Sequence, residues 1–418
     1  MIKKTIFLLF IFTAELLFAQ QVPLNLSKYP FIKHKENVLE IPKNGDSILI
    51  NSFFAKLDSL YYTKQGKINV VHIGGSHVQA GFFSNKMRNN FNFFNDTLTP
   101  SAGIVFPFKI AKTNNPRHYS VDYQGDWTTT RSVLRKNFTF PLGVTGIAVE
   151  TVDSLAEISV RFLADSLGGN CLFDTLVLLG RSIDEGQVEP ILRTSDTTFI
   201  SAVYNSIQGT YTFALPQLTD SFSIYFKQND SIPHSFVLNG FIPKNGSQGI
   251  IYHAIGINGS AVPSYLNCEN FERELAMIKP DLMIFGIGIN DAVNTNFNPD
   301  IFINNYNLLL EKIRRVSPDC AFIFITNNDS FRRVRRNTYA VNNNGLKVEK
   351  AFYKIALQNN GAVWNQFDIM GGLSSMRKWQ NAGLASVDKI HFTKNGYELL
   401  ADMLFNSLME YRENIANH

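Results

Sequence analysis

The sequence predicts an α/β protein with a parallel, doubly wound sheet that is interrupted by an all-β module. Short β-branched runs followed by amphipathic helices occur early in the chain and return from Gly249 onward. Between Gly103 and Gln248 the chain instead contains short alternating segments punctuated by Gly, Asp, Asn and Ser. Strands separated by helices favour a parallel sheet, whereas closely spaced short strands favour a sandwich. A chain of 418 residues has room for both.

The first strand–helix unit lies at residues 68–94. Ile68–Ile73 is a β-branched run that ends at Gly74 and Gly75, which favour a tight turn. From Val78 to about Phe94 the apolar residues recur at helical spacing. This unit has no other strands nearby in the sequence, so we expect its strand to join the later ones and the β module to be an insertion.

The later part of the chain alternates strands and helices. The predicted elements are a strand at Asp281–Gly286, a helix from Pro299, a strand at Ala321–Ile325, a helix at Leu346–Gln358, a strand at Gly361–Trp364 and a helix at Lys394–Tyr411 that Thr393 caps. We therefore divide the chain into a leader at residues 1–19, an α/β domain at 20–102 and 249–418, and a β-rich module at 103–248.

The N-terminus has the features of a cleaved secretory signal. Two lysines precede an apolar stretch at Ile6–Phe12, and the small residue Ala19 marks a cleavage site. Glu15 argues against a permanent membrane anchor, because a carboxylate is costly inside a bilayer. We expect a periplasmic or secreted protein with no stable membrane insertion after cleavage.

Charge and cysteine content exclude other classes. The net charge of +4 is too small to indicate a polyanion such as nucleic acid as the partner. Cys171, Cys268 and Cys320 are too few and too widely spaced for a disulfide framework or a zinc site. We interpret them as small buried residues, although one pair could form.

The first candidate for chemistry is Ser76, in the turn between a buried strand and a helix. A hydroxyl there projects above the carboxyl edge of the sheet, beside the free amides of the helix start. This arrangement suits a nucleophile, although serines after Gly–Gly also serve as helix N-caps. A base is offered by His391, and Asp388 can hold its imidazole tautomer. The alternative for this pair is a cap on the final helix.

Two glycine-containing segments could bind an oxyanion. Phe285–Asp291 follows a strand and includes Asn290, whose amide is a neutral, fixed donor. Gly256–Ser260 is a second turn near a strand end, where Gly259 can donate a bare amide. The alternative for each segment is an ordinary loop.

Together the four segments resemble the ordered serine, glycine, Gly-x-Asn-Asp and Asp-x-x-His blocks of the SGNH hydrolases, also called the GDSL esterase family. The resemblance covers about Ile68–Phe94 and Tyr252–His418. It implies a flavodoxin-like three-layer α/β/α domain that needs no metal or organic cofactor. It also implies catalytic roles: nucleophile Ser76, base His391, orienting partner Asp388, and oxyanion donors from the Ser76 amide, the Gly259 amide and the Asn290 side chain.

The serine block departs from the family pattern at Gly75, where the family has Asp. Glycine permits the turn but loosens it, so we expect an effect on rate more than on reaction type. The inserted module resembles, in its placement, that of bacterial peptidoglycan O-acetylesterases, whose insert looks like a carbohydrate-binding module. We expect a serine esterase that removes acyl groups, with acetyl as the first candidate, from an acylated glycan. The alternatives are a glycan O-acyltransferase and a catalytically impaired glycan-binding protein. No signal for an oligomeric state is present.

Three other features have two interpretations each. His72 and His77 are expected to be packing or turn residues rather than second bases, because neighbouring side chains diverge. Trp127 and Tyr123 of the module either pack in the core or stack on sugar rings. A basic run after the strand near residue 326 is either a solvated face or a binding surface for an anionic glycan or peptide carboxylate; it comprises Arg332, Arg333, Arg335 and Arg336.

Overall fold

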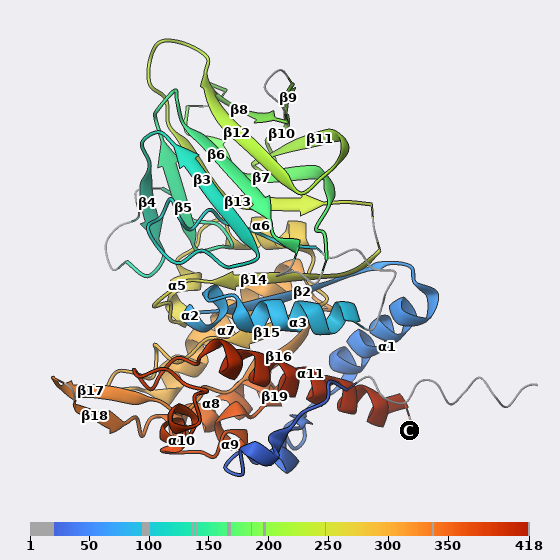
Figure 1. Ribbon diagram of the computed structural model, residues 1–418, viewed down its shortest axis with the longest axis vertical. Helices are drawn as coiled ribbons and strands as arrows, with labels where there is room; N and C mark the ends of the chain where they lie inside the picture. Colours follow the sequence, from blue (N-terminus) through green and yellow to red (C-terminus); the bar gives the residue numbers. More distant parts are fainter. Residues whose placement is uncertain are drawn as a thin grey trace, which may run out of the picture.

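The computed structural model describes residues 21–93, 101–134, 138, 140–164, 169–184, 186–194, 198–246, 248–336 and 338–416. The expected signal at Met1–Ala19 lies outside these residues. Figure 1 shows an α/β body with a β-rich module on one edge of its sheet. Of the helices in the described ranges, none combines the length and the hydropathy that a membrane span requires.

The α/β body is built on a six-stranded sheet. In spatial order its strands are β1 (Leu39–Glu40), β19 (Ala362–Trp364), β16 (Ala321–Ile325), β15 (Leu282–Gly286), β2 (Lys67–Gly74) and β14 (Gly249–Gly256). The five strands other than β1 are parallel, and numbered among themselves in chain order they run 2-1-3-4-5, the flavodoxin-like order. The short edge strand β1 pairs antiparallel with β19, so the sheet is mixed rather than wholly parallel.

Helices cover both faces of this sheet because its strands alternate their apolar side chains between the two faces. On one face Val70 and Ile284 pack with helices α1, α3, α9, α10 and α11. On the other, Val71 and Phe285 pack with α5, α6, α7 and α8. The bounds are α1 (Ile48–Thr63), α3 (Phe82–Phe93), α5 (Val262–Leu266), α6 (Phe271–Ile278), α7 (Pro299–Val316), α8 (Gly345–Gln358), α9 (Gln366–Ile369), α10 (Ser375–Asn381) and α11 (Lys394–Ala416), with 3₁₀ turns at Leu26–Lys28 and His34–Glu36.

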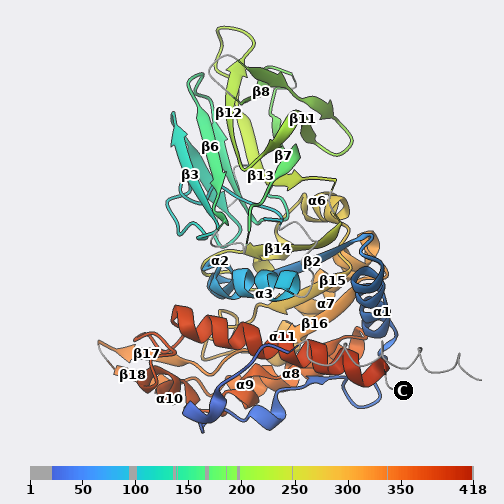
Figure 2. The same cartoon turned by 45° about the vertical axis from the view of Figure 1, so that its right-hand side comes forward.

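The helix expected from Val78 to about Phe94 is interrupted. A short helix, α2 (Ser76–Gln79), ends before Gly81, whose φ of +78° breaks the helical path, and α3 then begins at Phe82. Position 94 lies outside the described residues. The break lets α2 begin at Ser76 while α3 lies against α11 (Figure 2).

The module between β2 and β14 is a β-sandwich. One sheet contains β10 (Val203–Asn205), β11 (Thr210–Thr219), β7 (Phe173–Ser182), β13 (Phe236–Lys244), β5 (Ile147–Thr151) and β4 (Thr128–Arg131). The other contains β3 (Tyr119–Gln124), β6 (Glu157–Phe162), β12 (Ser221–Gln228), β8 (Val188–Arg193) and β9 (Phe199–Ser201). Trp127 packs edge-on against Phe226, 5.4 Å between ring centroids, which favours its packing role.

Two smaller expectations also have outcomes. All three cysteines are buried and free, so none pairs. The basic run forms part of a two-stranded antiparallel hairpin that the sequence analysis did not predict, consisting of β17 (Phe331–Arg335) and β18 (Thr338–Val341).

Candidate active site

Ser76, His391 and Asp388 meet at the carboxyl edge of the sheet. The Ser76 Oγ lies 2.7 Å from His391 Nε2, and His391 Nδ1 lies 2.7 Å from Asp388 Oδ2. The other oxygen of Asp388 accepts the backbone N–H groups of Ile390 and His391, at 2.9 and 3.0 Å. Ser76 and His391 are 315 positions apart in the sequence, and His391 and Asp388 are 3 positions apart. The fold joins all three in one series of hydrogen bonds.

The Asp388 carboxyl group in this series of hydrogen bonds has a lowered pKa. Partial burial opposes the ionisation of Asp388, but the hydrogen bonds from the His391 ring and from the two backbone amides outweigh it and lower the pKa of the carboxyl to about 2. An ionised carboxylate can only accept a hydrogen bond. It therefore fixes the tautomer with the proton on Nδ1 and leaves the Nε2 lone pair facing the Ser76 hydroxyl.

Hydrogen bonds from another segment of the chain hold the turn that carries Ser76. The carbonyl of Gly74 accepts hydrogen bonds from the Ser260 hydroxyl at 3.1 Å and from the Tyr265 hydroxyl at 2.7 Å. Gly74 itself is required by close packing, since a Cβ there would lie 2.8 Å from the carbonyl oxygen of Gly286. A Cβ on Gly75 would meet its nearest neighbour at 3.4 Å, an ordinary contact, so space does not exclude a side chain at that position.

Three candidate donors lie on segments near Ser76, where a Cβ on the adjacent Gly75 would lie 3.5 Å from Asn290 Nδ2. The Ser76 amide opens α2 and has no acceptor within the helix. Asn290 Nδ2 donates one hydrogen to the carbonyl of Ser260, at 2.9 Å, which orients the amide and leaves its second hydrogen for another acceptor. Gly259 adopts a φ of +83°, and its amide has no acceptor among the described residues. The structure thus brings all of the sequence-predicted site residues to one edge of the sheet.

Gln79 positions the glycine turn, a role that the sequence analysis missed. Its Oε1 accepts the Asn258 amide at 2.6 Å, and its Nε2 donates to Thr113 Oγ1 at 3.1 Å and to the carbonyl of Asn114 at 2.8 Å. The side chain is buried and links α2 to a segment inside the module, at Thr113 and Asn114, and to the glycine turn that follows the module. Its place one turn after Ser76 on the same helix face was the available signal.

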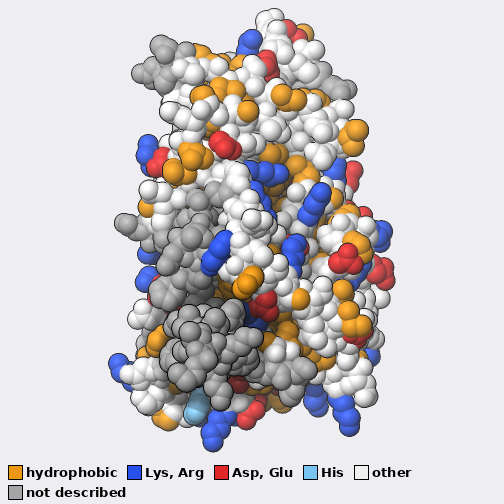
Figure 3. Space-filling view, turned by 90° about the vertical axis from the view of Figure 1, so that its right-hand side faces the viewer, with side chains coloured by type: hydrophobic (Ala, Val, Ile, Leu, Met, Phe, Trp, Pro, Cys, Tyr) orange, Lys and Arg blue, Asp and Glu red, His pale blue; other side chains and the backbone are white. Residues whose placement is uncertain are grey.

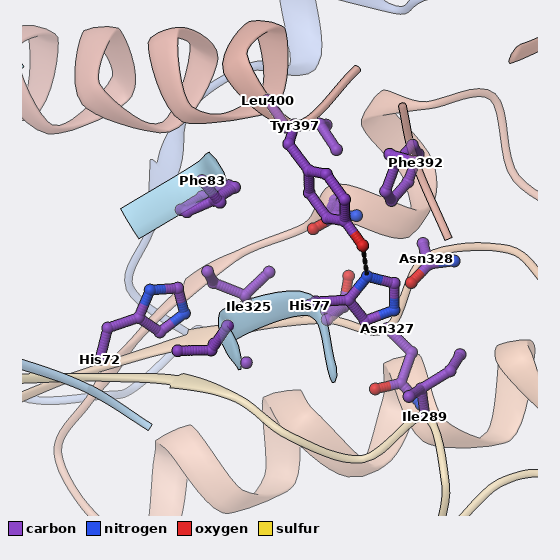
Figure 4. A pocket seen from close by; sticks show the side chains of 14 residues that line it. His72, His77, Phe83, Ile289, Ile325, Asn327, Asn328, Phe392, Tyr397 and Leu400 are labelled. Carbon is purple, nitrogen blue, oxygen red and sulfur yellow. Dashed lines mark hydrogen bonds between the residues drawn. The ribbon is translucent and has the colours of Figure 1, made fainter. Parts of the chain in front are cut away.

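The two histidines near the site are buried and weakly basic. Burial, with a smaller contribution from the nearby His391, lowers the pKa of His77 to about 3, and burial lowers that of His72 to about 3. His77 Nδ1 pairs with the Tyr397 hydroxyl at 2.8 Å, and Figure 4 shows this bond at the edge of a small cavity beside α2. His72 Nδ1 pairs with the Tyr252 hydroxyl at 2.9 Å. Both contacts favour packing roles, as expected.

Residues 234–399 match the model of the GDSL-like lipase/acylhydrolase family. The chain contains a GDSL-like lipase/acylhydrolase domain. This acylhydrolase domain is of the carboxylic ester hydrolase class, and the matched residues include Gly259, Asn290, Asp388 and His391, whereas Ser76 precedes them. The comparison with curated proteins finds no match.

Solved structures extend the likeness to most of the chain. A peptidoglycan O-acetylesterase matches with a TM-score of 0.70 at 22% identity, over 87% of this chain and 96% of that one. A catalytic mutant of an acetylxylan esterase from Geobacillus stearothermophilus matches with a TM-score of 0.31 at 19% identity, over 38% of this chain and 73% of that one. A lipase/acylhydrolase from Enterococcus faecalis matches with a TM-score of 0.30 at 20% identity, over 40% of this chain and 78% of that one. The family match and the first structural match together show an SGNH hydrolase fold with an additional β-rich module.

Proposed function

We propose that this protein is an exported serine esterase that hydrolyses acyl esters, with acetyl as the first candidate, on a glycan such as peptidoglycan. The observation that carries the proposal is the 2.7 Å contact between Ser76 Oγ and His391 Nε2, with Asp388 on the opposite ring nitrogen. A serine hydroxyl becomes a nucleophile when an adjacent, oriented base can take its proton. In this proposal residues 20–102 and 249–418 form the hydrolase domain, and residues 103–248 are its insert.

The reaction follows from the positions of the groups. Ser76 Oγ attacks the ester carbonyl carbon while His391 Nε2 accepts the hydroxyl proton, and the imidazolium is stabilised by ionised Asp388. The tetrahedral oxyanion accepts hydrogen bonds from the Ser76 amide, the Gly259 amide and the Asn290 side chain. Collapse expels the sugar oxygen, which takes the proton from His391. Water then attacks the acyl-enzyme by the same route and releases the carboxylate.

One observation supports the glycan as substrate, and a second supports export of the protein. The structure that matches over 87% of the chain is that of a peptidoglycan O-acetylesterase, and it includes the β-rich module. The N-terminal residues carry a basic start, an apolar stretch and a small residue at the expected cleavage point, as secretory signals do.

The test is release of nitrophenol from p-nitrophenyl acetate by the mature protein. We expect turnover by the unaltered protein and a fall of at least about a thousandfold for Ser76→Ala, because this substitution removes the nucleophile. Ser84→Ala, which alters a buried serine on α3, is the matched control and should retain activity. Equal rates for the unaltered protein and Ser76→Ala would end the esterase proposal. Free acetate rather than acetylated sugar is the product expected when a glycan acceptor is added.

A further inference from the structure

The β17–β18 hairpin is attached to the segment that carries His391 and Asp388. The backbone amide of Phe331, the first residue of β17, donates to the carbonyl of Lys389 at 3.0 Å. The Asn328 side chain, just before the hairpin, donates to the carbonyl of Ile390 at 3.0 Å. The Lys389 ammonium lies 4.8 Å from the centroid of the Tyr339 ring on β18. The root of the hairpin therefore lies next to the proposed catalytic segment.

This hairpin carries a concentration of positive charge with no acidic partners. Arg333, Arg335 and Arg336 are exposed, and Arg332 is half-buried. Within the described part of the chain, none of these four guanidinium groups forms an ion pair with a carboxylate. Other arginines do find such partners: Arg193 pairs with Glu157, Arg315 with Glu272 and Arg412 with Asp58.

The charges extend outward from the site. At about 3.3 Å per residue, the arginines of β17 from position 332 to position 335 span about 10 Å of strand, and Arg336 follows in the turn. Figures 1 and 2 both show the hairpin projecting from the end of the α/β body at which α2 begins. The face on the other side of the molecule differs, because acidic and basic side chains are interspersed there (Figure 3). The clustering of like charges on the hairpin is therefore not repeated on that face.

We propose that the arginine hairpin, defined as Arg332, Arg333, Arg335 and Arg336 on β17 and its turn, binds carboxylate groups of the glycan whose ester is held at Ser76. This inference rests on the proposed function and narrows its substrate class to acylated glycans that carry carboxylates. Guanidinium groups match carboxylates through paired, charge-assisted hydrogen bonds. Four like charges on one short hairpin also repel one another, and bound carboxylates relieve that repulsion. A neutral acylated glycan would gain nothing from these residues.

The experiment measures binding, so that it does not depend on turnover. Solubilised, O-acetylated peptidoglycan fragments that retain their peptide carboxylates are titrated into the mature Ser76→Ala protein and into the same protein carrying Arg333→Gln, Arg335→Gln and Arg336→Gln. We expect the dissociation constant to rise about tenfold in the arginine variant, and to rise with added salt in the parent. A second preparation, with its carboxylates converted to amides, should bind both proteins equally.

Two controls make the result decisive. Arg315→Gln removes an exposed arginine from α7, which is paired with Glu272, and should leave the affinity unchanged. Equal thermal melting temperatures for parent and variants show that the hairpin substitutions do not unfold the protein. Equal affinity of the parent and the arginine variant for the carboxylate-bearing fragments, or an equal loss on the amidated ones, would overturn the proposal. Absence of p-nitrophenyl acetate turnover in the unaltered protein would instead count against the esterase function, and the binding difference would stand on its own.

Discussion

The two hydrogens of the Asn290 side-chain amide have different roles in the proposed mechanism, and a single substitution can test this. One hydrogen of Nδ2 is committed to the Ser260 carbonyl at 2.9 Å, which fixes the direction of the other. Loss of one oxyanion donor typically costs about 2.7–4 kcal/mol of transition-state stabilisation. Asn290→Ala should therefore reduce kcat by about a hundredfold or more with a small effect on KM, measured as nitrophenol release. A variant with a raised KM and an unchanged kcat would show that Asn290 binds substrate and does not stabilise the oxyanion.

The residues proposed to react could be predicted from the sequence, whereas the residues that hold them in place could not. Ser76, Asp388 and His391 lie in short local patterns whose chemistry can be recognised in the sequence. Gln79 and Tyr265 act through contacts with segments tens to hundreds of residues away, since Gln79 reaches Asn258 and Tyr265 reaches Gly74. A side chain whose role depends on a distant backbone group leaves no local pattern in the sequence.

The element that decides the geometry of Ser76 is the turn between β2 and α2. Gly75 lacks the side chain that the family pattern has there, and the carbonyl of the preceding Gly74 is anchored by hydroxyls from another segment, those of Ser260 and Tyr265. This anchoring restrains a turn in which glycine at position 75 has wide conformational freedom. It also explains why rate, and not only stability, should respond to changes at a residue remote from the reacting atoms.

Tyr265→Phe tests this anchoring. The substitution keeps the buried ring and removes one hydroxyl, so we expect a loss of about 1 kcal/mol in the free energy of unfolding. Because the turn would then be held by Ser260 alone, kcat on p-nitrophenyl acetate should fall severalfold while KM changes little. Tyr306→Phe is the matched control, since its hydroxyl bonds the Ile287 carbonyl on the same side of the sheet. An equal fall in kcat for both variants would show that the effect is general loosening rather than a property of this turn.

The strands and helices that were predicted for the α/β body lie close to their observed limits, because strong apolar periodicity and turn residues mark them. Helices α1, α5, α6, α9 and α10 were not predicted. The strand at Ala321–Ile325 coincides with β16, and the predicted N-cap of the final helix is present, with Thr393 Oγ1 accepting the Gly396 amide at 3.3 Å. The break at Gly81 was missed, because the apolar spacing continues across it. The hairpin at β17–β18 was missed because charged strands lack the alternation that identifies a buried sheet.

At the scale of the whole molecule, the module and the hydrolase domain share a core and a buried carboxylate. Val144 and Val237 of the module belong to the same apolar cluster as Leu275 of α6. Glu274, also on α6, accepts the Val144 amide at 2.8 Å and the Asn239 side chain at 2.7 Å. Burial raises the pKa of Glu274 to about 7, although these hydrogen bonds act in the opposite direction.

This carboxylate makes the stability of the protein depend on pH. A native pKa above the ordinary value of 4.5 means that the folded protein holds a proton which the unfolded chain releases. The free energy of unfolding should therefore fall as pH rises from about 4.5 to about 7, with Glu274 contributing up to about 3 kcal/mol of that fall. Glu274→Gln should flatten the decline, because its amide does not titrate.

The measurement is urea unfolding of both proteins at pH 5 and pH 7.5. The new amide can donate to Asn239 Oδ1, which has no partner among the described residues, so the variant keeps its packing. Every other titrating group is common to both proteins, and the difference between their pH dependences isolates Glu274. Parallel pH dependences would contradict the assignment.

The parallel sheet and the inserted sandwich followed from the alternation of element types along the chain, whereas the flavodoxin-like strand order was implied only by the family resemblance. The contact between the module and α6 could not be predicted from the sequence, because Glu274 has the sequence context of an ordinary charged helix residue. The antiparallel strand β1 was also missed, since it has only two residues and depends on β19 for its pairing.

The most direct test of the whole account is covalent labelling of the mature protein with a serine-directed phosphonate, followed by peptide mapping. An oriented base beside one hydroxyl should give a single adduct on Ser76, absent from Ser76→Ala and formed far more slowly in His391→Ala. Adducts spread over several serines, or labelling that proceeds at an unchanged rate without the His391 imidazole, would contradict it.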